Sequence, residues 1–137
     1  MSELIKISNA VNLAVHALIE LSVNTDVSLQ VKEISEKFST SEAHLSKVLQ
    51  QLRKAGFVHA VRGPKGGYQL LLKPSEIKLS AIFSAIEGPI EIHSCLFGRS
   101  GCGKINCKLG NKIKGFNQEI FDFLNGCTLA DVVEGKF

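Results

Sequence analysis

The sequence contains no run of apolar residues that approaches the roughly 18 needed to cross a membrane. It begins Met-Ser-Glu and lacks the basic segment, apolar stretch and cleavage site of a secretory leader. Nucleotide-binding fingerprints, a His-Glu-x-x-His motif and a Ser/His/Asp arrangement are also missing. These absences predict a cytoplasmic protein that is not an enzyme and has no membrane partner.

Acidic residues are missing from one long stretch. The 137-residue chain carries a net charge of only +3, but residues 43–75 contain six lysines and arginines and no Asp or Glu. This stretch predicts a local basic face, which on charge alone is equally compatible with a solvated surface and with a nucleic-acid partner. With 45% hydrophobic and 21% charged residues, the chain has the composition of an ordinary folded domain.

Apolar periodicity predicts three helices in the first half of the chain. Residues 9–22 are apolar on almost every side, as in a buried helix. A short extended piece precedes an amphipathic helix over residues 31–38. Ser39, three residues before Glu42, fits a capping box for a third helix that ends at Gly56. The last two helices are therefore separated by a short polar turn.

A β-hairpin is expected next, because residues 57–61 and 68–72 are rich in strand formers and the segment between them is dense in Gly. Helix, turn, helix and hairpin in this order are typical of a winged helix-turn-helix, in which the N-terminal residues of the second helix enter the major groove. That end carries Ser41, His44 and Lys47 as candidate DNA contacts. The alternative is that Ser41 only caps the helix and His44 is simply exposed.

The tip of the hairpin is the second candidate DNA contact. Arg62 and Lys65 supply positive charge there, and Gly63, Gly66 and Gly67 remove side chains that would keep the backbone away from another polymer. Arginine suits the narrow minor groove, where the potential is most negative. The alternative is an ordinary glycine-rich turn between two strands.

The second half of the chain begins with a short helix. Ser80 is expected to cap this helix, which Gly88 ends. Residues 93–110 have no periodicity and are expected to form a loop. A helix of about four turns, ending near Gly126, follows from apolar residues at helical spacing. These residues are Ile113, Phe116, Ile120 and Leu124.

Three of the four cysteines fall in the expected loop, as Cys95-x6-Cys102-x4-Cys107. Thiolates are soft metal ligands, and three so close together can converge on one centre. The spacing lacks the Cys-x2-Cys knuckle of structural zinc sites, which favours an iron–sulfur cluster over zinc. Redox-active or packing cysteines are the remaining alternative. Cys127 stands apart and is expected to be a small packing residue.

The combined pattern resembles the Rrf2 family of bacterial regulators, which includes the IscR-type and NsrR-type iron–sulfur repressors. The most specific matching element is the wing sequence, and the resemblance covers essentially the whole chain. Four segments carry it: Asn-Leu-Ala-Val-His-Ala-Leu (12–18), Leu-Arg-Lys-Ala-Gly-Phe-Val (52–58), Val-Arg-Gly-Pro-Lys-Gly-Gly-Tyr (61–68) and Thr-Leu-Ala-Asp-Val (128–132).

The resemblance implies a mainly α fold with a small β-hairpin wing: a winged helix-turn-helix followed by a long C-terminal dimerisation helix. It divides the chain into a DNA-binding domain (1–90), a cysteine-rich cluster loop (91–110) and a dimerisation helix with its tail (111–137). Positions facing the major groove would be Ser41, His44, Ser46 and Lys47. The wing positions, which would meet the minor groove, are Arg62, Gly63, Lys65, Gly66, Gly67 and Tyr68.

The resemblance also implies that Cys95, Cys102 and Cys107 hold the cluster, of the 2Fe–2S or 4Fe–4S type. Two family positions for a fourth ligand are occupied here by Gly110 and Asn12, neither of which is a good ligand. His16 matches a histidine that some members use, and it would come from the partner subunit. The alternative for His16 is a helix histidine that bonds to a backbone carbonyl.

The sequence thus predicts a homodimeric repressor that binds a palindromic operator in double-stranded DNA. Its affinity would be controlled by an iron–sulfur cluster that senses iron, redox state or nitric oxide. A winged-helix regulator with zinc or redox-active thiols is the first alternative. An iron–sulfur electron carrier is the second, but it leaves the wing without a role.

Overall fold

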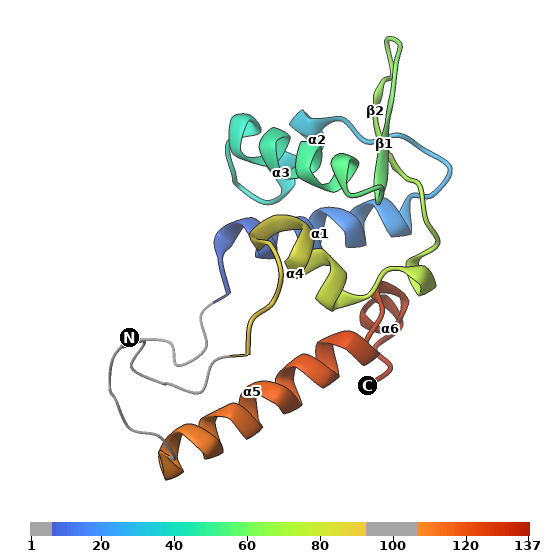
Figure 1. Cartoon of the computed structure of the whole chain (residues 1–137). Helices are drawn as coiled ribbons and strands as arrows, with labels where there is room; N and C mark the ends of the chain where they lie inside the picture. Colours follow the sequence, from blue (N-terminus) through green and yellow to red (C-terminus); the bar gives the residue numbers. More distant parts are fainter. Residues whose placement is uncertain (1–6, 93–106) are drawn as a thin grey trace.

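The computed structural model describes residues 7–92 and 107–137 (Figure 1). Helix, turn, helix and hairpin follow one another as expected, and a long helix comes later in the chain. The wing projects at one end of the molecule, and the long helix crosses the opposite end. The elements are α1 (Asn9–Val23), α2 (Val31–Lys37), α3 (Glu42–Lys54), β1 (Val58–Val61), β2 (Gly67–Leu70), the 3-10 turn η1 (Pro74–Glu76), α4 (Leu79–Glu87), α5 (Lys108–Gly126) and α6 (Leu129–Glu134).

Helix α1 lies at the centre of the core, in contact with both α3 and α4. It begins where the Ser8 hydroxyl accepts a hydrogen bond from the Val11 backbone N–H at 3.2 Å. Apolar residues occupy most of its surface, so it is buried on several sides, as the sequence predicts. The buried residues of α1 are Val11, Leu13, Ala14, Ala17, Leu18 and Leu21.

The turn between α2 and α3 corrects the predicted capping box. Ser41, rather than Ser39, is the N-cap of α3, and its hydroxyl accepts a hydrogen bond from the His44 backbone N–H at 3.1 Å. Ser39 instead adopts a left-handed conformation with φ of 50°, which lets the chain reverse within the turn. Glu42 is consequently the first residue of the helix and cannot close a box with Ser39.

The predicted hairpin is confirmed, and a third segment lies along its edge. Strands β1 and β2 are antiparallel, with Val58 opposite Leu70 and Val61 opposite Gly67. Leu29, in the connection between α1 and α2, forms an isolated antiparallel bridge with Tyr68. The wing is therefore attached to the core by a segment that precedes the helix-turn-helix.

Helix α4 does not begin as predicted. Lys78 occupies the N-cap position, and Ser80 lies inside the helix, 7% exposed. The Leu79 backbone N–H bonds to the Cys127 carbonyl at 2.9 Å, which starts the helix earlier than Ser80 could. The Ser80 hydroxyl instead donates to Oδ1 of Asn125 at 3.0 Å and so connects α4 to α5.

Helix α5 is longer than predicted, because it begins at Lys108, where a loop is expected from the sequence. Its 19 residues make about five turns. The residues that follow its C-terminal end are held to the core by backbone bonds: the Cys127 carbonyl accepts from Leu79 N–H at 2.9 Å, and Leu129 N–H, at the start of α6, donates to the Ile77 carbonyl at 2.8 Å. The other end points away from α4 and the core (Figure 1). No helix in the two described ranges is long and apolar enough to span a bilayer.

Candidate nucleic-acid interface and metal-ligand residues

Helix α3 presents one apolar and one polar side. Its apolar side is completely buried, with Leu45, Val48, Leu49 and Leu52 at 0 to 1% exposure. On the other side Ser41 and Lys47 are exposed, and His44 and Ser46 are half-buried. The Ser41 hydroxyl also caps the helix, so it keeps only part of its hydrogen-bonding capacity for another molecule. All four predicted residues are therefore at the polar N-terminal half of α3.

The predicted DNA contacts do not include the C-terminal half of this polar side, although Arg53 and Lys54 belong to the predicted basic stretch. Gln50, Arg53 and Lys54 are exposed, and with Lys47 and Gln51 they line an open hollow of about 470 Å³. The signal was available, because positions 47, 50 and 54 lie three and four residues apart and so share one helix face. Amide and cationic side chains of this kind bind base edges and phosphates.

The wing tip presents two exposed cations, Arg62 and Lys65. Gly63 has φ of 123° and open space around it, so its backbone is accessible to another molecule. At Gly66 and Gly67, contacts within the protein itself leave no room for a side chain. A Cβ at Gly66 would lie 2.6 Å from the Val61 carbonyl oxygen, and one at Gly67 would collide with the backbone of Leu29.

Tyr68 is half-buried and packs against the hydrophobic core. Its backbone exchanges two hydrogen bonds with Leu29, at 3.0 and 2.8 Å. These contacts give Tyr68 a structural role in fixing the wing, whether or not it also meets DNA.

His16 lies on α1 beside the turn that precedes α3. Its Nδ1 is 2.8 Å from the Asn12 carbonyl, as in the alternative that the sequence left open, and its ring contacts Phe38 edge-on with 5.6 Å between ring centroids. The side chain is exposed, so Nε2 is the ring nitrogen not engaged with Asn12. A hollow of about 190 Å³ adjoins it, lined also by Asn9, Leu13, Ser39 and Thr40.

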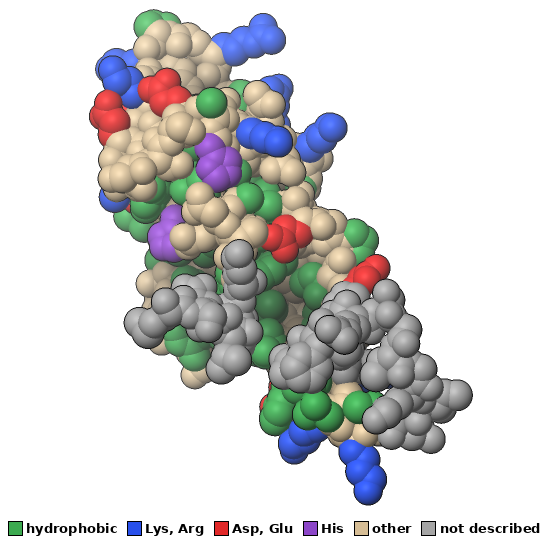
Figure 2. Space-filling view, turned by 90° about the vertical axis from the view of Figure 1, so that its left-hand side faces the viewer, with side chains coloured by type: hydrophobic (Ala, Val, Ile, Leu, Met, Phe, Trp, Pro, Cys, Tyr) green, Lys and Arg blue, Asp and Glu red, His purple; other side chains and the backbone are tan. Residues whose placement is uncertain are grey.

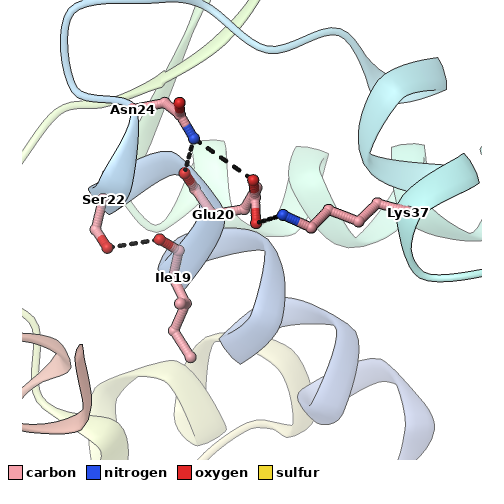
Figure 3. Close-up of polar contacts among 5 residues, drawn as sticks. All are labelled: Ile19, Glu20, Ser22, Asn24 and Lys37. Carbon is pink, nitrogen blue, oxygen red and sulfur yellow. Dashed lines mark hydrogen bonds and ion pairs between the residues drawn. The ribbon is translucent and has the colours of Figure 1, made fainter. Parts of the chain in front are cut away.

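One turn further along α1, Glu20 connects this helix to α2 (Figure 3). Its carboxylate is 2.6 Å from the ammonium of Lys37, and the Asn24 amide donates to the Glu20 carbonyl at 2.9 Å. Ser22 donates to the Ile19 carbonyl at 2.6 Å within the same helix. The ion pair links α1 to α2, and the other two hydrogen bonds are local to the C-terminal end of α1.

Two of the cysteines can be placed. Cys107 is exposed and is the N-cap of α5, where its sulfur accepts a hydrogen bond from the Gly110 backbone N–H at 3.3 Å. Cys127 is 5% exposed, which confirms the expected packing role. Burial, followed by the nearby charge of Asp131, raises the pKa of the Cys127 thiol and makes it a poor ligand at neutral pH.

The remaining predicted ligands, Cys95 and Cys102, lie outside the described residues. Within residues 7–92 and 107–137, no group of three or more His, Cys, Asp and Glu side chains could hold a metal ion. His16 and Cys107 thus belong to no such group of three or more in this part of the chain.

Helix α5 leaves an apolar face exposed. Of the four predicted stripe residues, Phe116 and Ile120 are 49% and 40% exposed, whereas Ile113 and Leu124 are half-buried. The sequence missed two members of the face, Leu109 at 51% and Phe123 at 53%. Figure 2 shows hydrophobic side chains at the lower end of the molecule, with Lys or Arg side chains beyond them.

The fold, with an exposed polar recognition helix and a basic wing, defines a DNA-binding transcriptional regulator of the winged-helix class. Residues 7–135 match the family described as Rrf2, iron-dependent transcriptional regulator, and the chain belongs to this family. This confirms the resemblance, the fold class and the expectation that the protein is not an enzyme.

Individual relatives agree with this assignment. The HTH-type transcriptional regulator IscR of Aliivibrio salmonicida (strain LFI1238) is 32% identical over 130 residues, which cover 93% of this chain and 77% of that protein. The structure of CymR (YrzC), the global cysteine regulator of B. subtilis, has a TM-score of 0.80 at 27% identity and covers 97% of this chain and 99% of its own. T. potens IscR has a TM-score of 0.76 at 25% identity, with 97% and 89% covered.

Proposed function

We propose that the protein is a homodimeric repressor whose operator affinity is controlled by an iron–sulfur cluster held by Cys95, Cys102 and Cys107. The observation that carries the proposal is the position of Cys107, which is exposed at the N-cap of α5, two residues before the exposed apolar face of that helix begins at Leu109. A ligand there adjoins the surface that we assign to the dimer. Because it acts on DNA, we place the protein in the cytoplasm.

The donor set fits a cluster in its chemistry. Three thiolates suit iron–sulfur ligation, and the amide of Gly110 already donates to the sulfur of Cys107, a type of bond that stabilises a ligating thiolate. His16 could supply the fourth ligand from the partner subunit through Nε2, since Nδ1 is occupied by the Asn12 carbonyl. The family description, iron-dependent, also supports this choice. When bound, such a group supplies a labile, redox-active centre.

The partner that covers α5 is a second copy of this chain. Leu109, Phe116 and Phe123 recur every seven residues, and Ile113 and Ile120 fall between them at alternating steps of four and three. This is the heptad spacing of two helices that pack with interlocking side chains. The five side chains make up what we call the α5 seam, and burying them between two copies would remove an apolar patch from water.

Charges beside the α5 seam favour an antiparallel pair. Lys112 and Glu119 are exposed and lie seven residues apart on one flank, and the Lys112 ammonium lies 5.2 Å from the Phe116 ring centroid. A twofold axis between them would set Lys112 of each subunit opposite Glu119 of the partner subunit. In a parallel pair the two helices run in the same direction, so Lys112 of one subunit would not lie opposite Glu119 of the partner subunit.

The antiparallel pair gives α5 a role in control. The helix is fixed to the DNA-binding part at its C-terminal end, through Asn125 and Ser80, and carries Cys107 at the other end. A change at Cys107 that alters the packing of the two α5 helices would also move the two DNA-binding parts relative to each other. Cluster state and operator affinity are then coupled, and the operator is a palindrome that mirrors the twofold axis.

The alternative with zinc or redox-active thiols has one specific observation in its favour. CymR is a cysteine regulator, and this chain matches its structure with a TM-score of 0.80. The same winged-helix architecture therefore serves a regulator that is named for a different signal.

Anaerobic purification followed by absorption spectroscopy and iron and sulfide analysis separates the two functions. We expect a coloured protein with bound iron and sulfide, and loss or gross alteration of the visible spectrum in Cys95→Ala, Cys102→Ala and Cys107→Ala. Cys127→Ala is the matched control and keeps the spectrum, because this thiol is buried and protonated. A colourless protein, or an unchanged spectrum in all three of these cysteine variants, would overturn the cluster.

A further inference from the structure

The segment between α1 and α2 makes a second contact with the wing besides the Leu29 bridge. The Ser28 hydroxyl donates a hydrogen bond to the Lys65 carbonyl at 2.7 Å, which connects residues 37 positions apart in the sequence. The hydroxyls of Ser22 and Ser35, by contrast, donate to carbonyls three residues away in their own helices. The Ser28 bond is thus a tertiary contact with the wing tip.

The contacts around Ser28 are arranged in a row along the wing. Leu29 exchanges two backbone hydrogen bonds with Tyr68 in β2, and Gly67 lacks the Cβ that would collide with Leu29. Ser28 then reaches the turn itself at Lys65. The start of β2 and the turn that precedes it are therefore held by consecutive residues of one segment.

From this arrangement we infer that Ser28 is a positioning residue for DNA binding: its hydroxyl holds the wing tip so that Arg62 and Lys65 meet the same duplex as α3. The inference rests on the proposed DNA-binding function and on the contacts with DNA that the sequence predicts for Arg62 and Lys65. Without this bond, the turn at the wing tip would be held only through the two strands and the Leu29–Tyr68 backbone bonds. Ordering a mobile tip on DNA costs conformational entropy that a fixed tip does not lose.

The bond is accessible to solvent, so its effects on stability and on binding should separate. Ser28→Ala removes the hydroxyl, and water then satisfies the exposed Lys65 carbonyl that it bonded, which leaves the free energy of unfolding almost unchanged. The orientation of the tip is not restored by water. A merely structural serine would give the opposite result, with lower stability and no specific change in DNA binding.

The test uses the full-length protein and a duplex that the wild type selects from a random-sequence pool. In fluorescence-anisotropy titrations, Ser28→Ala should raise the Kd roughly three- to tenfold, with an unchanged urea midpoint. Ser28→Thr retains the hydroxyl and should restore wild-type affinity. Ser22→Ala is the matched control, because it removes a serine-to-carbonyl bond within α1 that does not involve the wing.

A double-mutant cycle shows whether the effect passes through the wing. In a background of Arg62→Ala and Lys65→Ala, adding Ser28→Ala should change the Kd by less than about twofold. An unchanged Kd for Ser28→Ala alone, or an equal loss in the background without the two cations, would overturn the inference. A Kd that Arg62→Ala and Lys65→Ala leave unchanged would instead overturn the proposed wing contacts.

Discussion

Helices α3 and α5 have similar amphipathic patterns but opposite surroundings. The apolar side of α3 is buried at 0 to 1% exposure against α1, α2, α4 and β1 of the same chain. In α5, four of the five side chains of the seam are 40 to 53% exposed. The same kind of periodicity therefore marks an internal core in one helix and an uncovered surface in the other. What differs is whether the described part of the subunit, residues 7–92 and 107–137, supplies the covering element.

This difference predicts which property each helix controls. Substitutions in the buried side of α3 should affect folding, whereas substitutions in the α5 seam should affect assembly and leave the fold of each subunit intact. The joint between the two regions, at Ser80 and Asn125, should affect both.

The largest effect on folding is expected for Leu49→Ala. Leu49 is completely buried, and its truncation removes packing and leaves a cavity, which costs about 2 to 5 kcal/mol of the free energy of unfolding. Urea unfolding followed by circular dichroism, at one fixed protein concentration, measures the change. A loss below about 1 kcal/mol would mean that α3 is not fixed in the core as described.

Phe116→Lys should affect assembly by a similar magnitude. Phe116 lies at the middle of the α5 seam, and a charge there should raise the dimer dissociation constant at least about 30-fold, while the circular dichroism of the subunit is retained. Sedimentation velocity over a concentration series gives this constant.

Charge variants test the direction of pairing in the same assay. Lys112→Glu and Glu119→Lys should each weaken the dimer, and the double reversal should restore it. If the wild type were a monomer at micromolar concentration, the proposal that a second copy of the chain covers α5 would be wrong. If a dimer formed but Phe116→Lys did not weaken it, the interface would lie elsewhere.

At the joint, Asn125→Ala should lower the free energy of unfolding by about 1 to 3 kcal/mol, because it leaves the buried Ser80 hydroxyl without its partner. Adding Ser80→Ala removes the unsatisfied group and should recover part of the loss. If the double variant were less stable than Asn125→Ala by the full effect of Ser80→Ala, the two side chains would not be coupled.

The smallest effect is a pH dependence at the start of α6. Hydrogen bonds from the Thr128 backbone N–H and then its hydroxyl lower the pKa of Asp131 from its ordinary value of 3.8. A carboxyl whose folded-state pKa is lowered contributes stability above its unfolded pKa, and this contribution is lost as the pH falls through the folded pKa.

Asp131→Asn should therefore have a lower Tm than wild type at neutral pH, and the difference should shrink below about pH 4. Thermal melts across an acid pH series measure this. A difference that does not change between neutral and acid pH would contradict the assigned hydrogen bonds.

The order of the elements could be predicted from the sequence because periodicity and turn residues are local signals. The choice of cap could not be predicted in full: Ser39 and Ser41 both offer a hydroxyl before α3, and at α4 the bond from Leu79 N–H to the remote Cys127 carbonyl starts the helix before Ser80. The need for glycine at position 67 also depends on a tertiary contact, because a Cβ there would collide with the backbone of Leu29, which is remote in sequence.

The limits of the α5 face also depend on tertiary structure. Leu124 and Phe123 are equally apolar neighbours, but only contact with the rest of the subunit makes Leu124 half-buried and leaves Phe123 exposed. For the metal site, the sequence indicates the three cysteines by type and spacing, while Cys95 and Cys102 lie outside the described residues. Their convergence with Cys107 stays a prediction.

The central claim is that a cluster on Cys95, Cys102 and Cys107 controls operator affinity. Its most direct test is an anaerobic titration of the selected duplex with the coloured protein and with the same preparation after the cluster has been removed by a chelator. We predict that the two Kd values differ by about 5- to 150-fold, the usual range of coupling between two sites, and that Cys107→Ala follows the cluster-free curve. Equal Kd values for the two forms would contradict the claim.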